Sequence, residues 1–160
     1  MQDLNLHYMD EAIQIAYEGM KKGAGGPFGA VIVKNNVIIS KAHNCVLSQC
    51  DPTAHAEVTA IRLASQNLKQ FDLSGCEIYT NGMPCPMCMG ALYWARIDKI
   101  FYACDAQAAS KIGFDDAKFY EEFIKPMSDR HVPCIQLIEY EAAGKACFSK
   151  WASKLDKTSY

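Results

Sequence analysis

The sequence predicts one α/β domain, residues 1–160, with a three-layer α/β/α arrangement around a five-stranded mixed sheet. Two observations support this prediction. Half of the 160 residues are hydrophobic, which is enough for one sizeable core. Segments with helical periodicity also alternate with short apolar segments of strand length. Because no repeat, linker or low-complexity segment divides the chain, we expect no second domain.

The first quarter of the chain predicts a helix and a hairpin. Apolar residues recur at helical spacing over 6–22, and a glycine follows the last of them. Residues 28–33 and 37–41 are predicted strands, joined by a tight turn at Asn35–Asn36. The glycine-rich stretch 23–27 lacks the features of a phosphate-binding or dinucleotide motif and is predicted as a loop beside a pocket.

The rest of the chain predicts further strands and helices in alternation. A second helix is expected to begin near Asp51. The later predicted strands are 77–79, 100–103 and 134–140, and the later predicted helices are 85–96, 105–125 and 145–157. Gly113-Phe114-Asp115-Asp116 interrupts the helix predicted at 105–125.

The stretch Asp51-Pro52-Thr53-Ala54-His55-Ala56-Glu57 predicts one half of a metal site. Asp51 suits a helix cap and Pro52 suits the first helical position, which places His55 in the opening turn. Glu57 follows two residues later and points in another direction around the helix. It can therefore flank a metal ion without binding it, which suits a proton carrier.

The stretch Pro84-Cys85-Pro86-Met87-Cys88 predicts the other half. Pro84 can open a helix whose first turn carries Cys85 and Cys88 on one face. A helix N-terminus favours the ionised thiolates that bind metal. One imidazole and two thiolates form a three-ligand zinc site that keeps a fourth position for water, as catalytic zinc sites do. The predicted cofactor is one Zn²⁺ per chain.

Charge and composition exclude several classes of protein. The net charge of −2 and the scattered lysines and arginines argue against nucleic acid and favour a small-molecule substrate. No positive cluster opens the chain and no run of about eighteen apolar residues occurs, so neither export nor membrane insertion is predicted. The eight cysteines are expected to be reduced in the cytoplasm. Of these, Cys76, Cys104 and Cys134 are predicted as small buried side chains.

Five segments together resemble the short bacterial-type guanine deaminases of the cytidine deaminase superfamily: 25–34, 51–62, 84–88, 90–96 and 113–116. The H-x-E and P-C-x-x-C motifs are shared by zinc-dependent nucleobase deaminases in general. The Pro-Phe-Gly, Tyr-Trp-Ala-Arg and Gly-Phe-Asp-Asp stretches point to the guanine branch. The resemblance covers nearly the whole chain and implies a cytidine deaminase-like fold.

This resemblance implies the hydrolysis of guanine, a small purine base, to xanthine and ammonia. His55, Cys85 and Cys88 would hold the zinc ion, and Glu57 would carry protons between water, base and departing ammonia.

The substrate contacts that the resemblance implies are Asn44, Phe28, Trp94, Asp116 and Tyr160. The Asn44 amide offers a purine edge a donor and an acceptor side by side, and Phe28 offers a stacking face. Asp116 and Tyr160 match positions linked to the choice of guanine. The family also implies a homodimer that exchanges a C-terminal segment, about 141–160.

Other interpretations remain open from the sequence. The substrate could be cytosine, a nucleoside or adenosine in tRNA, or the chain could be a non-catalytic scaffold stabilised by zinc. A Cys-x-x-Cys pair can also be a redox pair or half of a structural zinc site. Phe28 and Trp94 could be core residues, Asp116 a helix cap and Tyr160 a mobile tail. Met83 stands where relatives commonly have a glutamate, which leaves the contacts at the pocket rim open.

Overall fold

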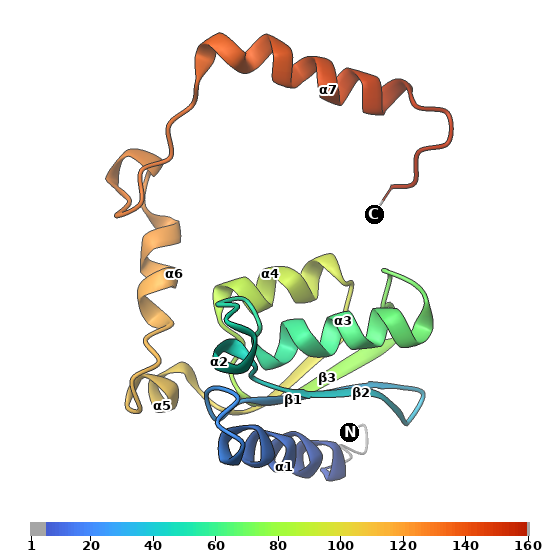
Figure 1. Cartoon of the computed structure of the whole chain (residues 1–160), viewed down its shortest axis with the longest axis vertical. Helices are drawn as coiled ribbons and strands as arrows, with labels where there is room; N and C mark the ends of the chain where they lie inside the picture. The colour runs from blue at the N-terminus through green and yellow to red at the C-terminus, as the bar shows by residue number, and fades with distance from the viewer. Residues whose placement is uncertain (1–5, 160) are drawn as a thin grey trace. The chain divides into compact units, whose positions relative to one another are not determined.

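The computed structural model describes residues 6–159 and shows two compact units, Met1–Phe119 and Tyr120–Tyr160 (Figure 1). The first unit contains a four-stranded mixed sheet: β1 Gly29–Lys34, β2 Val37–His43, β3 Cys76–Gly82 and β4 Lys99–Cys104. Its strand order is β2-β1-β3-β4. β1 runs antiparallel to β2 and β3, whereas β3 and β4 are parallel.

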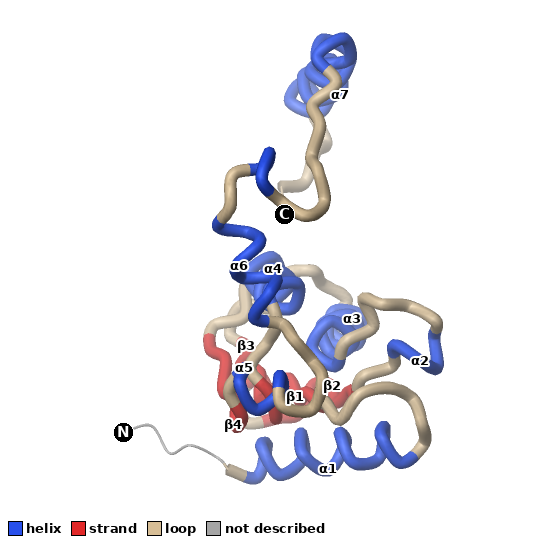
Figure 2. Tube along the Cα trace, turned by 90° about the vertical axis from the view of Figure 1, so that its left-hand side faces the viewer, coloured by secondary structure: helices blue, strands red, loops and turns tan. Residues whose placement is uncertain are grey.

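Helices cover both faces of this sheet, as the sequence predicts. Helix α1, His7–Lys21, lies on one face, and α3, Ala56–Leu68, and α4, Pro86–Trp94, lie on the other (Figures 1 and 2). Two short helices complete the unit, α2, Val46–Gln49, before α3 and α5, Ala106–Ser110, after β4. Helix α6, Ala117–Ile124, crosses the boundary between the units. In the described part of the chain, no helix has the length and apolar character needed to span a membrane.

The hairpin turn forms because asparagine tolerates left-handed backbone. Asn35 and Asn36 have φ angles of 50° and 62°, which two-residue hairpin turns require. β1 then lies in the middle of the sheet, and its side chains alternate between two cores. Val31 and Val33 pack towards α1, and Ala30 and Ile32 pack towards α3. The predicted turn and both predicted strands are confirmed.

Small side chains bring α3 close to the sheet. Ala56, Ala60 and Ala64 recur every four residues and are all fully buried. This face packs over Ile32 and Ile78, which are also fully buried. Since the N-terminus of α3 carries residues of the predicted metal site, the alanine face fixes the height of that site above the sheet.

The second unit has little core of its own. It comprises the end of α6, two 3₁₀ turns at Met127–Asp129 and Ile138–Tyr140, and helix α7, Glu141–Ser153. None of its described residues is buried. The following apolar side chains of residues 120–159 are exposed: Tyr120, Phe123, Ile124, Met127, Val132, Ile135, Leu137, Ile138, Tyr140, Phe148, Trp151 and Leu155.

The prediction of a fifth strand at 134–140 is wrong. Residues 132–137 have no regular structure, and Ile138–Tyr140 forms a 3₁₀ turn. A strand needs a neighbouring strand to satisfy its backbone groups, and none is described in this unit. Two further predictions are wrong, since Cys104 and Cys134 are exposed, whereas Cys76 is buried as expected.

We expect Ile78→Ala to destabilise the protein by about 2–5 kcal/mol, because it leaves a cavity where α3 packs on the sheet. The measurement is denaturant unfolding of the zinc-loaded protein. Val37→Ala is the control, since the Val37 side chain is 60 % exposed, and it should change stability by about 0.5 kcal/mol or less. Equal effects of the two substitutions would contradict this core assignment.

Candidate metal centre and active site

Two helix N-termini place the three predicted zinc ligands. His55 is the N-cap of α3 and Cys85 is the N-cap of α4, and both have extended backbone with ψ angles of 159° and 169°. Pro86 occupies the first turn of α4, where its missing N–H is no loss. Cys88 follows one turn later in the same helix. The side chains of the cap residues are not used as caps, which leaves them available to a ligand.

The helix starts differ from the prediction by a few residues. α3 begins at Ala56, so Asp51 is not its cap. The Asp51 carboxylate instead accepts hydrogen bonds from the Thr53 backbone N–H at 2.8 Å and from its hydroxyl at 2.7 Å. α4 begins at Pro86 rather than Pro84. Asp51 prefers this local turn because an aspartate readily bonds the backbone two residues ahead.

The spacing of the ligand atoms fits zinc. His55 Nδ1 lies 3.6 Å from Cys85 Sγ and 3.5 Å from Cys88 Sγ, and the three atoms all lie within 4.8 Å of one another. Zn–S bonds of about 2.3 Å and Zn–N bonds of about 2.0 Å at tetrahedral angles separate sulfur and nitrogen by about 3.5 Å. His55, Cys85 and Cys88 therefore form a site for one zinc ion per chain, with Nδ1 as the imidazole ligand.

The electrostatics of these residues favour a cation. The hydrogen bond from the Cys88 thiol lowers the pKa of the Cys85 thiol to about 4. Donating that bond, together with burial, raises the pKa of Cys88. The hydrogen bond to Cys85 also raises the pKa of the His55 imidazole above its ordinary value. Three polar donor atoms thus lie close together in a largely buried site, which suits the binding of a metal ion.

Two carboxylates lie beside the ligands. The side chain of Glu57 is in the first turn of α3 and is 6 % exposed. Burial raises its pKa, and the negative charge of Cys85 adds to the rise. Burial and the same thiolate also raise the pKa of Asp116. Glu57 and Asp116 are thus two ionisable groups that interact electrostatically with the metal ligands, and their roles stay predictions.

Asn44 is buried, and its position limits what it can offer a substrate. Its Oδ1 accepts hydrogen bonds from the backbone N–H groups of Gly26 and Val46, each at 3.2 Å. Because both neighbours are donors, the amide oxygen is already used and the two Nδ2–H donors remain. The expectation of a donor and an acceptor side by side is therefore corrected. Asn44 can present donors to acceptor atoms of a base.

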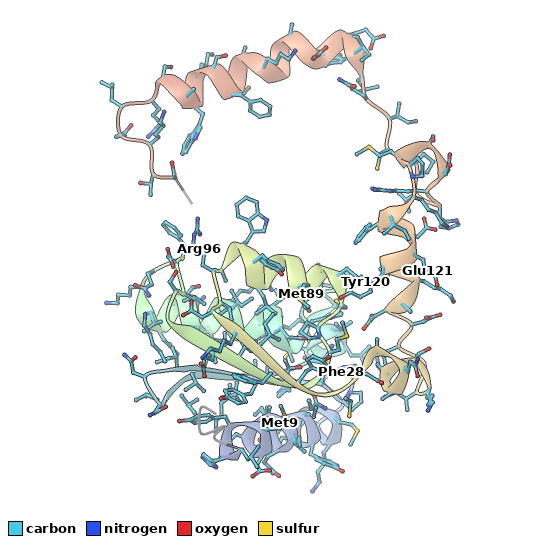
Figure 3. All side chains as sticks on the ribbon, turned by 180° about the vertical axis from the view of Figure 1, so that it is seen from behind. Met9, Phe28, Met89, Arg96, Tyr120 and Glu121 are labelled. Carbon is cyan, nitrogen blue, oxygen red and sulfur yellow. The ribbon has the colours of Figure 1, made fainter. Side chains whose placement is uncertain are left out.

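Sequence reasoning missed Asn81, which fixes the backbone on both sides of Phe28. Its Oδ1 accepts from Gly29 N–H at 2.9 Å, and its Nδ2 donates to the Pro27 carbonyl at 2.8 Å. Phe28 lies at the end of the sheet, near α5 (Figure 3). The same residues help to line an apolar hollow of about 390 Å³ between α1, the ends of β3 and β4, and α5. The sequence signal that could have indicated Asn81 is a polar residue near the end of an apolar strand.

The remaining predicted residues have different positions. Trp94 lies in the last turn of α4, six residues after Cys88 and 68 % exposed. Six helical residues span about 9 Å, so the structure does not bring Trp94 to the metal ligands, and its role stays a prediction. Tyr160 lies outside the described residues. Met83 is partly exposed and donates its backbone N–H to the Cys104 carbonyl at 2.8 Å, which ties the loop before α4 to β4.

A family model of the cytidine and deoxycytidylate deaminase zinc-binding region matches residues 3–104, which include the three ligands and Glu57. The chain belongs to this family. It is accordingly a zinc-dependent hydrolytic deaminase with a cytidine deaminase-like fold, and its sheet has four strands rather than the predicted five.

Known deaminases match this chain over different lengths. A guanine deaminase of Bacillus subtilis is 44 % identical over 153 residues, which is 96 % of this chain and 97 % of the relative. A solved structure of guanine deaminase from Bacillus subtilis has a TM-score of 0.94 and 43 % identity, covering 98 % of this chain and 99 % of that one. A tRNA-specific adenosine deaminase of Aquifex aeolicus is also 44 % identical, but over 61 % of this chain and 64 % of the relative. The similarity to guanine deaminase alone among these spans nearly the whole chain.

We expect Cys85→Ala to lose most of its zinc, because it leaves two ligands and removes the sulfur with the low pKa. The metal content of the purified protein, measured by mass spectrometry, tests this. Cys50→Ala is a matched control because Cys50 is exposed and outside the ligand group. One zinc per chain in Cys85→Ala would remove Cys85 from the ligand set.

Proposed function

We propose that the chain hydrolyses guanine to xanthine and ammonia. The observation that carries this proposal is the 44 % identity to a guanine deaminase over 96 % of the chain, a range that reaches well beyond the zinc-binding region. The deaminases of tRNA match a shorter part of it. The substrate is therefore a small purine base, and the scattered positive charge gives no support to a nucleic-acid substrate.

The chemistry requires the C2–N bond of guanine to break as a C2–O bond forms. Zinc held by His55, Cys85 and Cys88 would supply the Lewis acidity that lowers the pKa of a water molecule. Glu57 would take one proton of that water and deliver it to a ring nitrogen as the C2–O bond forms. It would then move the second proton, from the new hydroxyl on C2, to the amine, so that ammonia leaves as the carbonyl forms. Its burial suits this role because a raised pKa makes the carboxylate a better proton acceptor.

Three further residues would hold the base. Phe28 offers an aromatic face to the purine, and the Nδ2–H groups of Asn44 donate to its acceptor atoms. The carboxylate of Asp116 accepts hydrogen bonds when ionised, and guanine carries an N–H at ring position 1 where adenine carries a lone pair. This difference supports Asp116 as the residue that favours guanine.

Replacing Glu57 with Gln should abolish turnover, with a loss of at least about 10²-fold, because the amide cannot accept a proton. Zinc content should remain at one per chain, since Glu57 is not among the three ligand residues. Ammonia release and metal analysis on the same preparation test both parts. Retained turnover would exclude Glu57 as the proton carrier.

The substrate itself is tested with a panel of guanine, adenine, cytosine, cytidine and a tRNA anticodon stem-loop. Guanine should give the highest kcat/KM by at least about 10²-fold, because a site built around specific hydrogen-bond partners rejects bases that leave those partners unpaired. Faster turnover of adenosine in the stem-loop would favour the tRNA deaminases instead.

We further propose that the chain works as a homodimer in the cytoplasm and exchanges its C-terminal segment, about 141–160, between subunits. The exposed apolar side chains of the second unit support the exchange, because a segment that buries none of its described residues gains little stability alone. All eight cysteines are free, which suits a reducing compartment.

Mixed dimers test this exchange. Each Glu57→Gln chain supplies an intact C-terminus, and each chain that lacks Tyr160 supplies an intact Glu57. If Tyr160 reaches the partner's site, co-expression should restore about one quarter of wild-type activity from two impaired proteins, since random pairing gives half mixed dimers with one complete site each. Co-expression of Glu57→Gln with a chain that carries both changes is the control. No restoration would show that Tyr160 does not act across the dimer.

A further inference from the structure

The loop that carries Asp116 begins at a sharp end of helix α5. The Asp105 carboxylate accepts from Ala108 N–H at 2.9 Å and starts this helix. Gly113 then has a φ of +94°, which favours glycine and ends it. The backbone N–H of Phe114 returns to the carbonyl of Ala109, a buried residue, at 3.1 Å. The backbone of Phe114 is thereby fixed on the body of the first unit.

The ring of Phe114 packs on the loop that carries Phe28. The two ring centroids are 4.8 Å apart and the ring planes are nearly perpendicular at 88°, a favourable edge-to-face contact. Gly26 leaves space for the ring, because a Cβ at this position would lie 2.7 Å from Phe114 Cζ. Any larger residue at position 26 would therefore displace the ring.

Hydrogen bonds hold the backbone of the loop that carries Phe28, on which Phe114 packs. Asn81 bonds the backbone before and after Phe28, and Asn44 donates its backbone N–H to the Phe28 carbonyl at 2.9 Å. Of these residues, Phe28 and Asn44 belong to the proposed base-binding pocket. Phe114 thus connects the loop 113–116 to the loop that carries Phe28.

Asp116 lies on the loop 113–116, two residues after Phe114. It interacts electrostatically with His55 and Cys85, and its side chain is partly buried. The contact of Phe114 with Phe28 therefore also limits where Asp116 can lie.

We propose that Phe114 is a positioning residue, whose ring on Phe28 and Gly26 holds the loop 113–116 and thereby fixes the position of Asp116. Phe114 acts through Asp116 and does not itself contact the substrate. The role of Asp116 in binding guanine rests on the proposed function, but the anchoring of the loop does not.

The anchoring is tested without substrate, by amide hydrogen exchange in the zinc-loaded protein. Phe114→Ala and Gly26→Ala should each speed exchange in residues 113–117 by at least about tenfold, because each removes the seated ring. Exchange in residues 55–60 should stay unchanged, and so should zinc content. Phe71→Ala is the control, since Phe71 is a half-exposed phenylalanine after α3. Unchanged exchange at 113–117 in Phe114→Ala would overturn the proposal.

The link to Asp116 is tested by a double-mutant cycle of guanine binding in a Glu57→Gln background, where no turnover occurs. Phe114→Ala should weaken binding about tenfold when Asp116 is present and less than about twofold in Asp116→Ala. Equal losses in both backgrounds would show that Phe114 does not act through Asp116. A protein that binds no guanine would refute the proposed function, whereas the exchange measurement would still decide the anchoring.

Discussion

The structure depends on the convergence of two helix N-termini on one cation. His55 and Cys85 are the N-caps of α3 and α4, and Cys88 lies in the first turn of α4. Burial and the negative charge of the Cys85 thiolate both raise the pKa of Glu57 in this space. The helix N-termini favour negative charge here, and a zinc ion would neutralise it further. The same ion would stabilise the junction of the helices and supply the Lewis acidity.

The sheet and its loops supply the other half of the site. β1 is buried on both faces, and the loop before it carries Phe28 between hydrogen bonds from Asn81. Asn44 follows β2, and its amide oxygen accepts hydrogen bonds from the backbone N–H groups of Gly26 and Val46. Hydrogen bonds thus hold the backbone around Phe28, a residue of the proposed pocket. Asp116 lies on a loop, for which the contact of Phe114 with Phe28 provides an anchor.

In a single chain, many apolar side chains of the second unit are exposed. Its apolar side chains recur along α6 and α7, yet none of its described residues is buried. Apolar surface of this extent usually marks an interaction site, which agrees with the proposed exchange between subunits. The strand expected at 134–140 has no partner strand in the unit, so the composition of a strand is present without the hydrogen bonds that define one.

The sequence by itself determined the three residues of the zinc site, the Asn35–Asn36 turn and the break at 113–116, because each follows from residue type and short spacing. Tertiary structure decided the features that depend on distant neighbours. It turned Asp51 from a helix cap into a local turn, assigned the Asn44 oxygen to the backbone, and left Cys104 and Cys134 exposed. It also placed Phe114 on Phe28, 86 residues apart in sequence but in edge-to-face contact. Short sequence patterns determine which residue types lie close together along the chain. Burial and strand pairing depend on contacts between segments that are far apart in the sequence.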